Sequence, residues 1–156
     1  MQTAFDTARA EAFAGKMVGV LIDAAVALMT SLGHRTGLFD AMRDRPPATS
    51  RDLAAAAGLS ERYVREWLAA LTVGGVLDHD PAADTYHLPA EHAACLTRAA
   101  APNNLAAATQ WVAVLGGVED EVAAAFRHGR GVPYAAYRRF HEVMAEESDQ
   151  TTVAAL

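Results

Sequence analysis

Residues 49–89 have the sequence TSRDLAAAAGLSERYVREWLAALTVGGVLDHDPAADTYHLP, and this stretch decides the expected fold. Ser50 is a favourable N-cap for a short helix over 51–57, after which Gly58-Leu59-Ser60 can make a tight turn. The next helix has apolar side chains at i, i+3, i+4 and i+7, which are Val64, Trp67, Leu68 and Leu71. This spacing predicts that one face of the second helix is buried in a core.

Two short strand-like runs follow, at 76–79 and 85–88, and turn-forming residues fill the interval 80–84. Helix, three-residue turn, helix and hairpin is the order of elements in a winged helix-turn-helix. We therefore predict a mainly α fold, made of a winged helix-turn-helix with a small β-hairpin wing and additional flanking helices.

The flanking segments have helical spacing on both sides of this unit. Upstream we expect a helix that ends near Gly33, followed by a short helix over 36–42. The apolar face of the longer helix is formed by Val18, Leu21, Ile22, Ala25, Leu28 and Leu32. Downstream, further helices are expected over 90–100, from Asn103 or Asn104 to the Gly116-Gly117 break, from Val118 to Phe126, after Pro133, and again from Thr151. The chain thus divides into N-terminal helices (1–48), the winged unit (49–89) and a helical extension (90–156).

The charge of the chain disfavours nucleic acid as a partner. Its formal net charge is −6, and proteins that bind DNA gain most of their affinity by neutralising phosphates. On the second helix, Arg62 and Arg65 could contact a phosphate backbone or base edges, but Glu61 and Glu66 would repel the same backbone. The wing is acidic as well, at Asp78, Asp80 and Asp84. These residues favour a winged helix that packs against protein.

Two alternatives stay open at this point. One is a free-standing winged-helix transcriptional regulator, whose salt-dependent affinity for DNA would be lost when Arg62 and Arg65 are changed to Ala. The other is a small ligand-binding or protein-interaction domain with neither activity.

The sequence carries no sign of an oxidising compartment or of a membrane. Cys95 is the single cysteine, so no intramolecular disulfide can form. The apolar stretch 17–32 is interrupted by Asp23 and is shorter than the ~20 residues that a membrane span needs. We expect a cytoplasmic protein without membrane contact.

Complete catalytic and metal motifs are absent from the sequence. His141-Glu142 begins like the zinc motif H-E-x-x-H, but Ala145 stands where the second imidazole is required. The other histidines, His34 among them, are not at ligand spacing and are expected to face solvent or to bond locally. There is no phosphate-binding loop, no dinucleotide-binding glycine turn and no nucleophile elbow. We predict no metal site and no complete active site.

Three sequence stretches resemble a known enzyme family. The first pairs AFAGKMV (12–18) with GHRTGLF (33–39), the second is GLSERYVREWL (58–68), and the third pairs VPY (132–134) with RFHEVMAEES (139–148). In this order they resemble the N-terminal winged-helix region of bacterial class I S-adenosylmethionine-dependent methyltransferases. The resemblance spans nearly the whole chain.

The resemblance implies a specific role for the winged helix. In that family this region helps to form a homodimer, here through the helices of 1–48, and covers the pocket of a small-molecule acceptor. S-adenosylmethionine is bound by a following Rossmann-like domain, and this sequence ends at Leu156 before any such domain. We therefore expect no cofactor site in this chain, no catalysis by the chain alone, and a fragment or truncated product of a longer enzyme.

The resemblance also indicates where an acceptor would be contacted. The last helix offers aromatic surface and one imidazole near the expected junction with the cofactor domain, formed by Tyr134, Tyr137, Phe140, His141 and Met144. His141 is a hypothetical general base in a complete enzyme. The alternative is that Tyr137, Phe140 and Met144 simply pack in the core.

Overall fold

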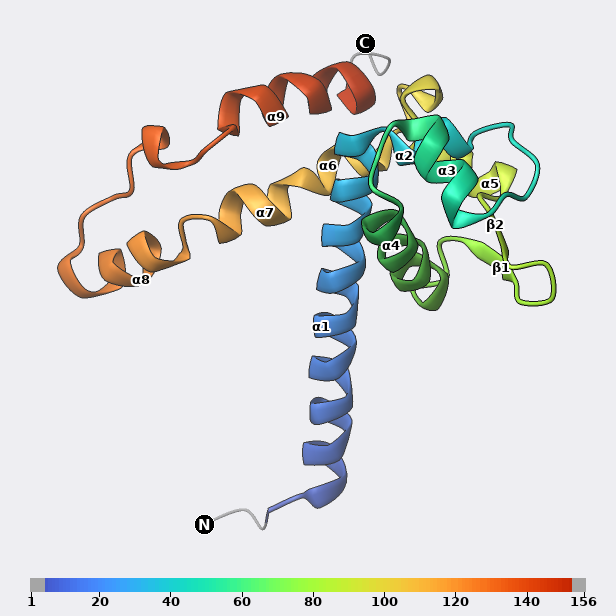
Figure 1. Cartoon of the computed structure of the whole chain (residues 1–156). Coiled ribbons are helices and arrows are strands. Elements are labelled where there is room, and N and C mark those ends of the chain that lie inside the picture. The colour runs from blue at the N-terminus through green and yellow to red at the C-terminus, as the bar shows by residue number, and fades with distance from the viewer. Residues whose placement is uncertain (1–4, 153–156) are drawn as a thin grey trace.

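The computed structural model describes residues 5–152 and confirms the mainly α winged helix (Figure 1). A compact body holds α1 to α5 and the hairpin, and an arm formed by α6 to α9 extends from it. In chain order the elements are α1 (Thr7–Thr36), α2 (Leu38–Met42), α3 (Ser50–Ala57), α4 (Glu61–Val73), β1 (Asp78–Asp80), β2 (Thr85–His87), α5 (Ala90–Leu96), η1 (Arg98–Ala100), α6 (Leu105–Ala108), α7 (Gln110–Gly116), α8 (Glu119–His128), η2 (Tyr134–Ala136), α9 (Phe140–Glu147) and η3 (Ser148–Thr152).

The core of the body is centred on α4. The predicted face of this helix is buried, since Val64, Trp67, Leu68 and Leu71 are at most 5% exposed. Side chains from the other elements of the body close around it, including Phe39, Met42, Leu53, Leu77 and Leu88. Burial of apolar side chains on this scale is the main source of stability of the body.

The wing is a two-stranded antiparallel hairpin in which Asp78 pairs with His87 and Asp80 with Thr85. It is shorter than the sequence predicts, because Val76 and Leu77 donate their backbone N–H groups to the carbonyl of Leu71 and finish the turn that ends α4. Ala48 exchanges two backbone hydrogen bonds with Tyr86, which ties the α2–α3 connection to the wing.

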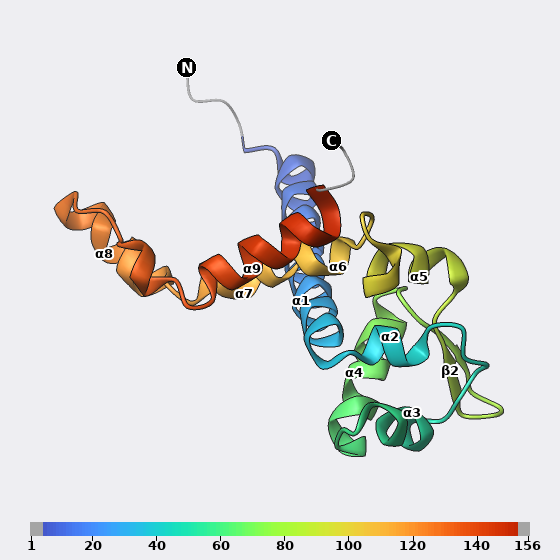
Figure 2. The same cartoon turned by 90° about the horizontal axis from the view of Figure 1, so that it is seen from above.

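Helix α1 is longer than the sequence predicts and does not stop at Gly33. Asp6 caps its start by accepting a hydrogen bond from the Arg9 N–H, and Gly37, with φ of 75°, caps its end in the left-handed conformation. Only the C-terminal turns are covered by the body, and the N-terminal part projects freely (Figures 1 and 2).

Gly33 instead allows α1 and α4 to approach closely. A Cβ atom at this position would lie 2.5 Å from Cζ2 of Trp67 and 2.7 Å from Cε2 of Phe39. Trp67 packs edge-on against Phe39, with ring centroids 5.2 Å apart, and its Nε1–H donates to the carbonyl of Met29 at 2.8 Å. One indole thus fills the core and holds α1.

The projecting part of α1 exposes its apolar side chains. Large side chains that are 43–68% exposed line this part of the helix, namely Phe13, Met17, Val18, Val20, Leu21 and Ile22, and Phe5 just before the helix is 83% exposed. Within residues 5–152, α1 is the one helix long and apolar enough to cross a membrane by length and composition alone. The prediction that residues 17–32 are too short to span a membrane was therefore wrong, because the helix that contains them is longer than that stretch. One such helix is weak evidence for a span, because apolar core helices pass the same test.

Several predicted helix boundaries are corrected by local hydrogen bonds. Thr49, not Ser50, caps α3, since its side chain accepts from the N–H of Asp52. The helix expected from Asn104 to Gly116 is divided at Thr109, whose hydroxyl donates to the carbonyl of Ala106. The helix expected from Thr151 continues a π-helical turn that begins at Ser148, and residues 153–156 lie outside the described part of the chain.

We predict that Gly33→Ala destabilises the chain by about 1–3 kcal/mol, because the added methyl group forces Trp67 and Phe39 apart. The free energy of unfolding from urea titration measures this change. Gly15→Ala is the matched control on the same helix, since nothing lies within 4 Å of its Cβ. It should be stabilising by up to about 1 kcal/mol through helix propensity. Equal effects of the two substitutions would refute the close-packing role of Gly33.

Candidate functional site

The candidate site lies on the arm, where α9 returns along α6 and α7 to the C-terminal end of α1 (Figures 1 and 2). Helix α8 lies at the far end of the arm in both views. Gly129, with φ of 69°, ends α8 in the left-handed conformation before the chain turns back. The return brings residues around 110 and around 140 together.

An aromatic cluster forms around Phe140 at the start of α9. Its ring centroid lies 5.1 Å from Trp111, 5.2 Å from Tyr134, 6.0 Å from Tyr137 and 5.4 Å from His141. Such tilted and edge-on contacts add to the apolar burial of the rings. The Trp111 Nε1–H donates to Oε2 of Glu147 at 2.6 Å and thereby fixes the indole on α9.

The structure brings four of the five predicted acceptor-lining residues into this cluster. Tyr134, Tyr137, Phe140 and His141 share ring contacts, whereas Met144 lies on α9 one turn after Phe140 without a ring contact. Tyr137 precedes α9 and is not part of the helix as predicted. Tyr134 is 69% exposed and Met144 46%, so this surface is partly open within residues 5–152. Of the three residues in the core-packing alternative, Tyr137 and Phe140 are half-buried and Met144 is exposed.

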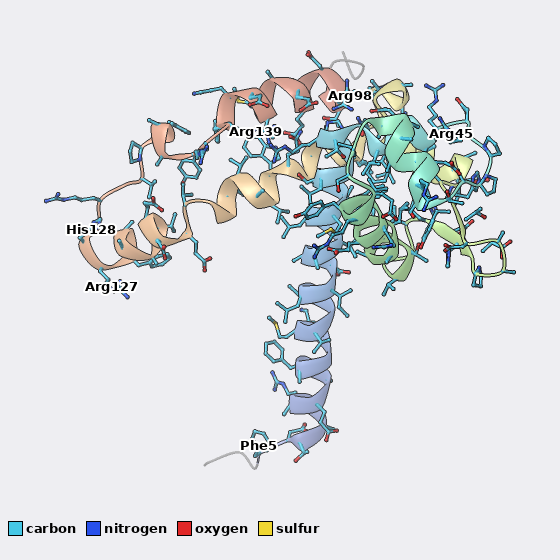
Figure 3. All side chains as sticks on the ribbon, in the orientation of Figure 1. Phe5, Arg45, Arg98, Arg127, His128 and Arg139 are labelled. Carbon is cyan, nitrogen blue, oxygen red and sulfur yellow. The ribbon has the colours of Figure 1, made fainter. Side chains whose placement is uncertain are left out.

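Arg139 starts α9 in a left-handed backbone conformation, with φ of 65°. Its guanidinium donates to both carboxylate oxygens of Glu142 at 2.7–3.1 Å and to Oε1 of Gln110 at 2.8 Å. The hydrogen bonds to Glu142 raise the pKa of Arg139, and the same bonds lower the pKa of the Glu142 carboxyl. Figure 3 shows Arg139 between α9 and α7.

Glu146 forms a second, more buried polar hub. Its carboxylate accepts from Nε2 of the buried His34 at 2.9 Å and from Nε2 of Gln110 at 2.7 Å. The guanidinium of Arg98 lies 3.7 Å away. Burial raises the pKa of Glu146, but the hydrogen bonds and the positive charge of Arg98 outweigh burial, so the net shift is downward.

Arg98 extends this hub to the body. It forms an ion pair with Asp40 of α2, and its Nη2 donates to the carbonyl of His34 at 2.9 Å. The backbone N–H of Arg98 also donates to the Asp40 carboxylate at 2.8 Å. The side chains around Glu146 therefore connect α1, α2, η1, α7 and α9 in one network.

The sequence reasoning missed the residues that hold the arm in place. His34 was expected to face solvent or to bond locally, but it is 1% exposed and bonds Glu146, which is 112 positions away. Trp111 and Gln110 were not singled out either. The available signal was two polar side chains, Glu146 and Glu147, in a helix with an apolar face, although their partners are too distant in sequence to identify.

On the face of α4 that would contact DNA in the regulator alternative, each arginine pairs with a glutamate of the same helix. Arg62 is bonded to Glu66 at 3.4 Å, and Arg65 lies 3.5 Å from Glu61, both at i,i+4 spacing. Tyr63 between them is 70% exposed. The two positive and two negative charges on this face thus cancel in sum.

The sheet within residues 5–152 is an antiparallel hairpin, without a parallel strand that leads into a glycine-rich turn. Among the same residues, no group of three or more His, Cys, Asp or Glu side chains could hold a metal ion.

Comparison with known proteins identifies the winged unit and a class of structural neighbours. Residues 24–98 match the Rv2258c-like winged HTH domain. PigF, solved with SAH, is 27% identical over 80% of this chain, with a TM-score of 0.59. The mitomycin 7-O-methyltransferase MmcR is 20% identical over 93%, with a TM-score of 0.68. Human N-acetylserotonin methyltransferase, in complex with SAM, is 17% identical over 94%, with a TM-score of 0.64.

The matches span 34%, 46% and 45% of those three chains, so this chain covers less than half the length of each. No curated protein sequence matches the chain.

We predict that acid weakens the attachment of α9 through Glu146. A carboxyl whose pKa is lower in the folded state contributes stability above its ordinary pKa of 4.5 and loses it as the pH falls through the folded value. The free energy of unfolding should therefore decrease below pH 4.5, and less so in Glu146→Gln. Chemical denaturation from pH 3 to pH 7 tests this. Glu91→Gln is the control, an exposed carboxylate on α5. Identical pH profiles for wild type and Glu146→Gln would contradict the role of the hub.

Proposed function

Since residues 24–98 match the Rv2258c-like winged HTH domain, we propose that the chain is the dimerising and acceptor-covering module of an S-adenosylmethionine-dependent methyltransferase acting on a small molecule. The observation that carries this proposal is the agreement of fold beyond the winged unit. The similarity to MmcR and to human N-acetylserotonin methyltransferase covers 93–94% of this chain, a share that also takes in α1 and the arm. The donor site would be supplied by a further domain.

The aromatic cluster is the proposed acceptor-contacting surface. Tyr134, Tyr137 and Phe140 offer ring faces and edges, and Met144 offers an adaptable apolar side chain. His141 lies at the edge of the same cluster and is exposed, which suits a group that exchanges a proton with a bound acceptor. The hub at Glu146 would keep α9 fixed while an acceptor binds. Such rigidity is what places reacting groups reproducibly.

Helix α1 is the proposed dimer interface. A run of exposed apolar side chains of this length is costly in water for a monomer. A groove of about 460 Å³ lies where the C-terminal half of α1 meets α4, and it is lined mainly by apolar side chains such as Met29, Leu32, Leu59, Tyr63 and Trp67. Two antiparallel copies of α1 about a two-fold axis would bring the projecting end of each helix toward the groove of the other.

The alternative of a DNA-binding regulator has less support. The intrahelical pairs of Arg62 with Glu66 and of Arg65 with Glu61 reduce the positive field that a phosphate backbone would meet. The wing residues Asp78, Asp80 and Asp84 add negative charge at the second expected contact. No observation on this face favours DNA over protein.

We predict that Phe13→Glu combined with Leu21→Glu converts the dimer to a monomer, because it introduces charges into the apolar face while keeping good helix formers. Light scattering after size-exclusion chromatography measures the mass. Val73→Glu is the control, an apolar side chain 90% exposed on α4, and it should leave the dimer intact. A wild-type chain of 16.5 kDa that stays monomeric at all concentrations tested would overturn the dimer proposal.

The methyltransferase proposal is tested on the native gene product, captured by antibody from the source cells. We expect an intact mass above 16.5 kDa. The excess should correspond to on the order of 150 further residues, which is enough for a cofactor domain. We also expect transfer of labelled methyl groups from S-adenosylmethionine to small molecules of a cell extract. A native mass of 16.5 kDa without any transfer in the presence of that extract would reject this function.

In that product, Phe140→Ala should reduce methyl transfer at limiting extract more than at saturating extract, because it removes acceptor contacts. His141→Ala should lower the turnover number between pH 6 and 8, because it removes the proposed general base. Exposed Phe126→Ala on α8 is the control and should change neither quantity. An unchanged turnover number across this pH range would remove His141 from the mechanism.

A further inference from the structure

A small pocket of about 170 Å³ lies beside the aromatic cluster, where the end of α1, the end of α7 and the start of α9 meet. Its polar lining comes from three arginines, Arg35, Arg138 and Arg139. The remaining wall is formed by Ala113, Val114 and Gly117. Three cationic side chains from segments about 100 positions apart thus converge on one recess.

The positive charge of this recess is only partly neutralised. Arg139 is bonded to Glu142 and Gln110, and the charge of Arg35 also acts on Glu142 to lower its pKa. Among the ion pairs within residues 5–152, none involves Arg35 or Arg138. Glu146, the other carboxylate whose charge acts on Arg139, already accepts from His34 and Gln110. Glu142 therefore balances the charges of Arg139 and Arg35 only in part, and no ion pair within residues 5–152 balances that of Arg138.

We infer that this pocket binds an oxyanion, the carboxylate or phosphate group of a small ligand. A guanidinium group presents planar, paired N–H donors that match both anions. Val114 and the helix ends shield one side of the recess from solvent, which strengthens the attraction there because solvent screens exposed charges. The volume accommodates a small group and not an extended polymer.

The location gives the anion a structural consequence. Arg35 belongs to the last turn of α1, and Arg138 and Arg139 precede α9, so a bound anion would bridge the body and the arm. The site adjoins the hub at Glu146 without using its carboxylate. This inference does not rest on the proposed methyltransferase function, since anion binding requires neither a methyl donor nor an acceptor.

Isothermal titration calorimetry of the 156-residue chain with inorganic phosphate, and separately with benzoate, tests the inference. We expect at least one probe to bind with a Kd of about 1 mM or tighter at low salt. Arg35→Gln combined with Arg138→Gln should weaken that binding at least about tenfold. Arg138→Gln alone, in an exposed position before α9, should weaken it in the same direction and leaves the last turn of α1 intact. Binding of phosphate alone would identify a phosphate ligand, and binding of benzoate alone a carboxylate.

The matched control removes two positive charges from another part of the arm. Arg127→Gln combined with Arg130→Gln changes two exposed arginines at the far end of the arm, where Figure 3 labels Arg127 well away from Arg139. It should change the Kd less than about twofold. The inference is overturned if neither probe binds, or if the control variant loses as much affinity as the pocket variant. Far-UV circular dichroism establishes that each variant is folded.

Discussion

The close approach of α1 and α4 at Gly33 is the constraint on which the rest of the structure depends. The Trp67 indole lies against this glycine, packs on Phe39 and donates its only hydrogen bond to α1. The body contacts α1 only through its C-terminal turns, so this crossing sets the direction in which the long apolar helix leaves the body. The same turns carry His34, whose burial starts the network that holds the arm. A single residue without a side chain therefore positions both the proposed interface and the proposed acceptor surface.

Polar contacts, together with the burial of Val143 and the packing of Phe140 on Trp111, attach α9 to the rest of the chain. Val143 is buried beneath the helix, but the specific contacts are made by Glu146, Glu147 and Arg139. A partly buried carboxylate is costly unless donors surround it, and Glu146 has donors from two helices and a guanidinium nearby. Removing Glu146 would leave the buried His34 and Gln110 without their common acceptor, so the residues of this hub act together. The arm is accordingly a defined part of the fold, although α8 at its tip contributes no buried side chain within the described residues.

The sequence predicted the winged unit well and the arm poorly, for one physical reason. In the winged unit, the signals are local: the Val64–Leu71 spacing, the Gly58 turn and the hairpin turn each act within a few residues. The aromatic residues near 140 were also identified from local spacing and resemblance. By contrast, the hydrogen bond of His34 to Glu146 joins residues 112 positions apart, and Gly33 looks like a helix stop until the indole against it is seen. Contacts between residues far apart in the chain produce no periodic pattern in the sequence.

Because α1 is long, a small rotation where it is attached to the body displaces its far end by a large distance. With a rise of about 1.5 Å per residue, the helix from the crossing near Gly33 to its first residue, Thr7, is roughly 40 Å long. A rotation of only about 10° at the Gly33–Trp67 contact would then move that far end by roughly 7 Å, more than one helical pitch. Small differences in side-chain volume at positions 33, 39 and 67 would therefore change which surfaces two copies can present to each other. Relatives with the same winged unit could differ in quaternary geometry while their cores remain nearly superimposable.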